Sequence, residues 1–114
     1  MQYLLLIYSA ESDEAKEDGE AIMAEYGVFT QGIVQNGNFK AADRLKPVAT
    51  ATTVRIRDGR TLTTDGPFAE TREQLGGYYL VEAKDLDEAT AIAAKIPTAK
   101  YGSVEVRPVW PMGG

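Results

Sequence analysis

The sequence predicts an α+β protein with a ferredoxin-like order: strand–helix–strand, an inserted hairpin, then a second strand–helix–strand. Three observations predict this fold. The segments 12–36 and 86–96 carry apolar residues at helical spacing. The segments 2–8 and 74–83 are apolar on both faces of an extended chain. Between the two halves, an Asp-Gly pair lies between two segments with alternating side chains.

The helix over residues 12–36 is predicted from one apolar stripe. The stripe consists of Ile22, Tyr26, Phe29 and Ile33. Asn36-Gly37 is a suitable end for this helix. Because several glycines in the segment each cost about 1 kcal/mol relative to alanine, the helix could begin nearer Asp18. A short strand is predicted to follow at 38–44.

The hairpin is predicted in the middle of the chain, over residues 50–57 and 60–65. These segments flank Asp58-Gly59, the pair that a type I′ turn prefers. The hairpin therefore separates the two strand–helix–strand units as an insertion.

The second unit begins with the strand 74–83. The helix 86–96 follows, with Asp85 as its N-cap and Pro97 directly after its end. The last strand is expected at 103–109.

A homodimer is predicted from the two strands that are apolar on both faces. In a ferredoxin-like sheet the first and third core strands are central, and here these are 2–8 and 74–83. Two helices cover only one face of a sheet. The other face needs a cover, and a second copy of the same sheet is the simplest one.

Composition excludes several kinds of site. The sequence contains no cysteine and no histidine, which excludes thiolate chemistry, a Ser-His-Asp triad and a histidine-ligated zinc or haem. The net charge of −5 argues against direct nucleic-acid binding. Apolar runs near the start are too short for a signal peptide or a membrane span. We therefore expect a single domain, 1–114, in the cytoplasm, with no cofactor, metal or membrane partner.

Residues 64–79 (TDGPFAETREQLGGYY) resemble the signature of the YCII-related DGPF-domain proteins. Residues 1–8, 49–55 and 104–110 are similar to the family's opening strand, hairpin start and ending. The resemblance implies a dimeric α+β barrel with a ferredoxin-like fold. It also implies a link to extracytoplasmic-function sigma factors, since some members lie beside them or are fused to them. The His–Asp pair suspected of catalysis in related proteins cannot be carried over, because this chain has no histidine.

Candidate functional residues gather around the DGPF loop. Asp65 and Glu70 are the candidate catalytic carboxylates, and general acid/base work would require one of them to have a raised pKa. The candidate ligand-binding residues are Arg72, Arg44, Phe68, Tyr78 and Tyr79. The alternative interpretation is that the loop only shapes the hairpin exit and docks Phe68 into the core.

Charge supports an anionic ligand, because residues 40–72 hold seven basic residues against four acids. Arginine binds carboxylate and phosphate through two parallel hydrogen bonds. The basic residues that could line such a site are Arg44, Lys46, Arg55, Arg57 and Arg72. Arg72 is the best candidate among them, because it lies close to Glu70 and the DGPF loop. The alternative is that these arginines belong to a solvated hairpin face. Either Tyr78 or Tyr79 must face the dimer side, where an apolar pocket could form, but packing is the favoured interpretation of these tyrosines.

Two functions remain open from the sequence. The first is a small-molecule binding or accessory, regulatory dimer. The alternative is a cofactor-free enzyme, similar to a monooxygenase or isomerase, with Asp65 or Glu70 as the base. The sequence contains no motif for that chemistry.

Overall fold

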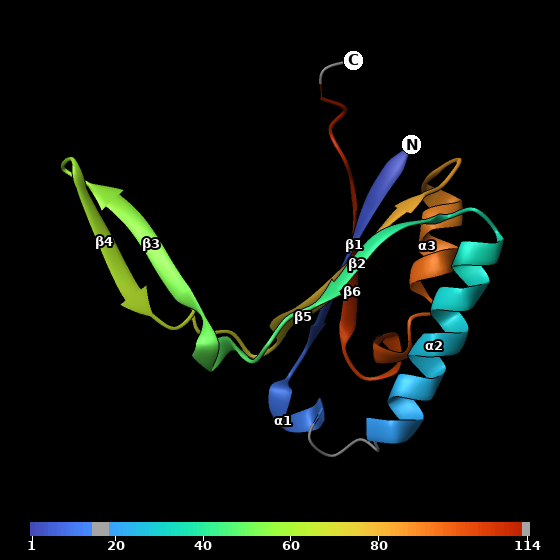
Figure 1. The fold of residues 1–114 in the computed structure, drawn as a ribbon, viewed down its shortest axis with the longest axis horizontal. Helices are drawn as coiled ribbons and strands as arrows, with labels where there is room; N and C mark the ends of the chain where they lie inside the picture. Colours follow the sequence, from blue (N-terminus) through green and yellow to red (C-terminus); the bar gives the residue numbers. More distant parts are fainter. Residues whose placement is uncertain (15–18, 113–114) are drawn as a thin grey trace.

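The chain folds into a four-stranded antiparallel sheet with helices on one face and a separate hairpin (Figure 1). The computed structural model describes residues 1–14 and 19–112. The helices and strands are β1 (Gln2–Ser9), α1 (Glu11–Glu14), α2 (Gly19–Gln35), β2 (Phe39–Arg44), β3 (Thr52–Arg57), β4 (Arg60–Asp65), β5 (Gln74–Glu82), α3 (Leu86–Ala93) and β6 (Ser103–Pro108). Short 3₁₀ turns lie at Val48–Thr50 and Pro97–Lys100. The predicted α+β class is confirmed.

The sheet has the strand order β2-β5-β1-β6, which is the ferredoxin-like order that the sequence predicts. The two central strands, β5 and β1, are the strands whose sequences are apolar on both faces. Leu5 of β1 lies opposite Tyr79 of β5, and Tyr3 lies opposite Val81. Their central position explains the pattern. A central strand pairs with a neighbour along each of its edges, and both of its faces can be covered by other layers.

The core lies between the sheet and the two long helices. Leu5 and Val81 are completely buried on the sheet side, against Phe29 and Ile33 of α2 and Ile92 of α3. Burial of each such side chain contributes roughly 1.5–3 kcal/mol. This layer fixes α2 and α3 on one face of the sheet.

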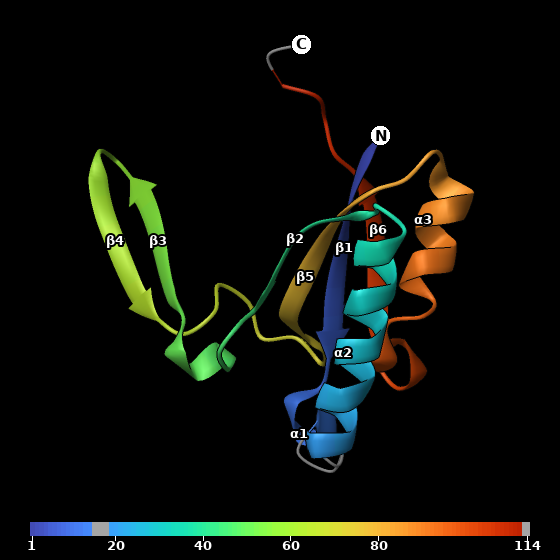
Figure 2. The same cartoon turned by 45° about the vertical axis from the view of Figure 1, so that its right-hand side comes forward.

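The opposite face of the sheet is also apolar. Across the β1–β5 ladder its side chains form the pairs Leu4–Leu80, Leu6–Tyr78 and Tyr8–Leu75. All six side chains are only half-buried. Figures 1 and 2 show α2 and α3 on the other side of the sheet. Within the described part of the chain, no helix covers this open face.

Where the structure describes the first predicted helix, 12–36, it shows two helical elements. α1 is a single turn, α2 begins at Gly19, and residues 15–18 lie outside the described residues. The end of α2 is as predicted, because Gly37 has a positive φ of 78°. The Gly37 N–H donates to Val34 O and the Asn38 N–H to Ile33 O, which is a Schellman motif.

The second predicted helix, 86–96, is too long by three residues. Its N-cap is confirmed, since Asp85 Oδ1 accepts the Glu88 N–H at 2.9 Å. The helix ends at Ala93 because the residue before Pro97 must be extended, and Ile96 has a ψ of 126°. Leu86, the first residue of α3, is exposed.

The hairpin β3–β4 projects from the sheet and pairs only with itself (Figure 2). Its turn is the one predicted, since Asp58 and Gly59 both have positive φ, at 51° and 74°. Every side chain of the hairpin except Thr53 is exposed. None of the helices described is long and apolar enough to cross a membrane.

Two glycine substitutions test the packing with opposite expected signs. A Cβ on Gly102 would overlap the carbonyl oxygen of Tyr8, whereas a Cβ on Gly27 of α2 meets nothing within 4 Å. Gly102→Ala is expected to lower the free energy of unfolding by about 1–3 kcal/mol through overpacking. Gly27→Ala is expected to raise it by about 0.5–1 kcal/mol, because alanine is the better helix former. Urea unfolding at one fixed protein concentration measures both, and a shift of the same sign would contradict the packing described.

Candidate active or binding cavity

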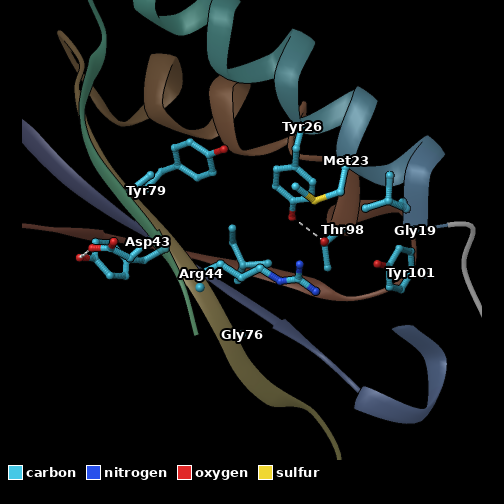
Figure 3. Close-up of a pocket in the computed structure, with 14 residues that line it drawn as sticks. Gly19, Met23, Tyr26, Asp43, Arg44, Gly76, Tyr79, Thr98 and Tyr101 are labelled. Carbon is cyan, nitrogen blue, oxygen red and sulfur yellow. Dashed lines mark hydrogen bonds between the residues drawn. The ribbon is translucent and has the colours of Figure 1, made fainter. Parts of the chain in front are cut away.

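A cavity of about 330 Å³ lies between α2 and the sheet, beside the edge strand β2 (Figure 3). Its lining comes from five regions of the chain: β1, α2, β2, β5 and the segment before β6. The lining residues are Ile7, Gly19, Ile22, Met23, Tyr26, Ala42, Asp43, Arg44, Gly76, Gly77, Tyr78, Tyr79, Thr98 and Tyr101. Aliphatic and aromatic side chains predominate, as in small-molecule sites generally.

Two tyrosine rings form one wall of the cavity. The rings of Tyr26 and Tyr79 are nearly parallel, with centroids 6.5 Å apart. Tyr26 Oη lies 2.6 Å from Thr98 Oγ1, and Tyr79 Oη lies 2.6 Å from Thr30 Oγ1. Burial raises the pKa of Tyr26 more than its hydrogen bond to Thr98 lowers it. Both hydroxyls are hydrogen-bonded to threonine side chains, so this wall offers an occupant apolar ring surface.

Arg44 supplies positive charge at the cavity. It is the last residue of β2, and its side chain extends across the cavity towards Thr98 and Tyr101 (Figure 3). Among residues 1–14 and 19–112, no carboxylate forms an ion pair with Arg44. Its guanidinium donors are therefore available to an anion in the cavity.

The neighbouring carboxylate, Asp43, has a different partner. Successive residues of a strand point to opposite faces, and Asp43 lies opposite Tyr78 of the open face while Arg44 lies opposite Gly77. The Tyr78 hydroxyl donates to Asp43 Oδ2 at 2.6 Å. This hydrogen bond raises the pKa of Tyr78, because it stabilises the neutral phenol. The strand alternation thus keeps the carboxylate away from the guanidinium.

Glycines of β5 form the floor of the cavity. The register of β1 and β5 shifts between Ile7, opposite Gly77, and Tyr8, opposite Leu75, so Gly76 is the extra residue of a bulge. A Cβ on Gly77 would lie 2.8 Å from the carbonyl oxygen of Asp43. The close approach of β2 requires glycine there, and the floor is left without a side chain.

Comparison with known proteins identifies the family. The model of the YCII-related domain matches residues 1–113. The chain belongs to the YCII-related family. It is similar to an uncharacterised protein of Rhizobium meliloti (strain 1021), with 40% identity over 114 residues that cover 96% of this chain and 92% of that protein.

The residues predicted from the sequence separate into two groups in this YCII-related chain. Arg44, Tyr78 and Tyr79 line the cavity. The other four lie outside it and are exposed at the base of the hairpin or in the loop that follows: Asp65, Glu70, Arg72 and Phe68.

The DGPF loop leaves the sheet rather than entering the core. Gly66 has a φ of 99°. Its N–H donates to Ala51 O, and its carbonyl oxygen accepts a hydrogen bond from the Thr53 hydroxyl. Phe68 is 78% exposed, so the interpretation that the loop docks Phe68 into the core is wrong for the single chain.

Sequence reasoning missed several lining residues. Tyr26 was assigned to the core stripe of the helix, and it does pack against the core while it also lines the cavity. Thr98 and Tyr101 follow the second helix, where no periodic pattern marks them. A tyrosine close to the start of a strand is the signal that could have drawn attention to Tyr101.

Other possible sites in the described residues have weaker support than the cavity. Within residues 1–14 and 19–112, no group of three or more acidic side chains is placed to hold a metal ion. A second hollow of about 580 Å³ lies between α2 and α3 and is more open to solvent. Its Lys100 is paired with Glu25 at 3.0 Å, so part of its charge is already neutralised.

Removal of the Asp43 carboxylate is expected to lower the pKa of Tyr78. In Asp43→Ala the neutral phenol loses its acceptor, and its pKa returns towards the ordinary tyrosine value of about 10. In the wild type, the hydrogen bond stabilises the fold fully below that ordinary value and ceases to do so as pH rises through the raised pKa. Ultraviolet titration of the tyrosines measures the change, with Tyr78→Phe to identify the group. Identical titrations of wild type and Asp43→Ala would contradict the assignment.

Proposed function

We propose that this YCII-related protein binds a small molecule with a flat apolar body and one anionic group, and that Arg44 binds the anion. The observation that carries the proposal is an arginine without an ion-pair partner among the described residues, aimed into a cavity walled by tyrosine rings. Charge-assisted hydrogen bonds from guanidinium to carboxylate or phosphate are among the stronger ones available to proteins.

The volume limits the size of the ligand. A water molecule takes about 30 Å³ of liquid, so the cavity holds the equivalent of roughly eleven waters. A ligand with on the order of ten non-hydrogen atoms fits this space. Aromatic carboxylates of this size match both the ring surfaces and the single guanidinium.

The functional unit that we propose is a homodimer. The open face of the sheet presents three apolar side-chain pairs that the chain's own helices leave uncovered. A second copy with the same face is complementary to it. An accessory or regulatory role, with a link to a sigma factor, is a proposal by family analogy alone, and the cytoplasmic location stays a prediction.

The alternative function is a cofactor-free enzyme that uses Asp65 or Glu70 as the acid/base group. A general base must lie within hydrogen-bond reach of the proton that it removes. In the single chain both carboxylates are exposed and neither lines the cavity. Binding therefore has more support than catalysis, unless a second copy places one of these carboxylates near a substrate.

Replacement of Arg44 tests the binding proposal. Benzoate serves as the probe and benzamide as its neutral analogue, and isothermal titration calorimetry measures both dissociation constants. The wild type is expected to bind benzoate more tightly than benzamide. Arg44→Gln is expected to weaken benzoate binding at least tenfold, since hydrogen bonds to charged groups contribute about 1.5–3 kcal/mol, and to leave benzamide nearly unchanged.

Two control variants locate the site. Arg72→Gln and Asp65→Asn change the DGPF loop outside the cavity, and both are expected to bind benzoate like the wild type. Loss of binding in either control, with Arg44→Gln unaffected, would move the ligand site to the loop and contradict the proposal.

A further inference from the structure

The hairpin β3–β4 has two faces of different character. Strand pairing places Val54 and Ile56 of β3 on the same face as Thr61 and Thr63 of β4. This β-branched face carries charge only at its base, on Asp65 opposite Thr52. The other face carries Arg55, Arg57 and Arg60 together with Leu62. A two-faced hairpin of this kind has one surface suited to contact and one suited to water.

The hairpin has no support from its own chain along most of its length. β3 and β4 form a sheet of two strands, and Val54 and Ile56 are 59% and 65% exposed. An isolated two-stranded hairpin is at best marginally stable in water. Exposed β-branched side chains on such an arm indicate a surface that is covered in the assembled protein.

The arm extends on the side of the sheet away from the helices. Figures 1 and 2 show β3 and β4 on one side of the four-stranded sheet and α2 and α3 on the other. The open face of the sheet and the arm are thus presented in the same direction. A second copy seated on the open face would lie beside the arm.

Area also favours a second copy as the occupant. At the usual strand spacing and rise, the four-stranded open face covers about 400 Å² in plan. A stable interface buries roughly 800 Å² of accessible surface on each partner. One face of the six-residue hairpin covers about 200 Å². The open face and the arm together cover about 600 Å² in plan per chain. Because projecting side chains give a larger accessible surface than this plan area, a two-fold dimer that buries both reaches the size of a stable interface.

We infer that the β-branched face of the β3–β4 arm docks on a second copy of this chain and forms part of the dimer interface, with the arginine face turned to water. This inference rests on the homodimer of the proposed function. It adds that the arm enlarges the interface beyond the two sheet faces and strengthens the dimer.

A matched pair of substitutions tests the inference. Ile56→Lys and Leu62→Lys both place a lysine at an exposed aliphatic position of the same hairpin, on opposite faces. Sedimentation equilibrium of the full chain measures the dissociation constant of the dimer, and circular dichroism checks that each variant is folded. Ile56→Lys is expected to raise this constant at least tenfold, while Leu62→Lys stays within about twofold of the wild type.

The outcomes separate the two proposals. A wild-type dimer that both variants leave unchanged, or that both weaken equally, would overturn the arm contact and leave the sheet-to-sheet dimer standing. A monomeric wild type would overturn the dimer and the arm contact together. The benzoate titration with Arg44→Gln is a separate measurement on the cavity, so its result does not depend on either outcome.

Discussion

A sheet whose two central strands are apolar on both faces is the constraint on which the structure depends. One face of β1 and β5 is buried by α2 and α3 through side chains such as Leu5 and Val81. The other face, with Leu6 and Tyr78 at its centre, has no cover from the described chain. Apolar area of this extent is costly in water, since each Å² exposed costs about 25 cal/mol. The proposed pairing of two copies follows from that cost.

The cavity arises from the same sheet at its β2 edge. Strand alternation turns Arg44 towards the helix side and Asp43 towards the open face, where Tyr78 binds it. The bulge at Gly76 and the close approach of β2 at Gly77 leave the floor of the cavity without side chains. Because Tyr78 belongs to the open face and also to the cavity lining, a dimer interface would lie close to the binding site. The proposed dimer interface and the proposed ligand site are therefore adjacent.

Much of the fold was predictable because its patterns are local. Segments apolar on both faces predicted the central strands β1 and β5, the stripe through Phe29 and Ile33 predicted α2, and Asp58-Gly59 predicted the hairpin turn. The end of α3 was not predictable from periodicity. Pro97 disfavours a helical backbone at Ile96, which is extended, and this effect does not appear in the spacing of apolar residues. The site was predicted only in part. Arg44 and the two tyrosines of β5 reach the cavity, but the loop with Asp65 leaves the sheet in the direction of the arm, and no sequence pattern encodes that direction.

The mass of the wild-type protein at high dilution tests the central claim most directly. Sedimentation equilibrium from high to low micromolar concentration, with circular dichroism at each step, reports mass and folding together. The uncovered apolar face predicts a mass twice that of the 12.4 kDa chain for as long as the native spectrum persists. A stable, fully folded particle of 12.4 kDa across that range would show that the open face tolerates water, and would contradict the account.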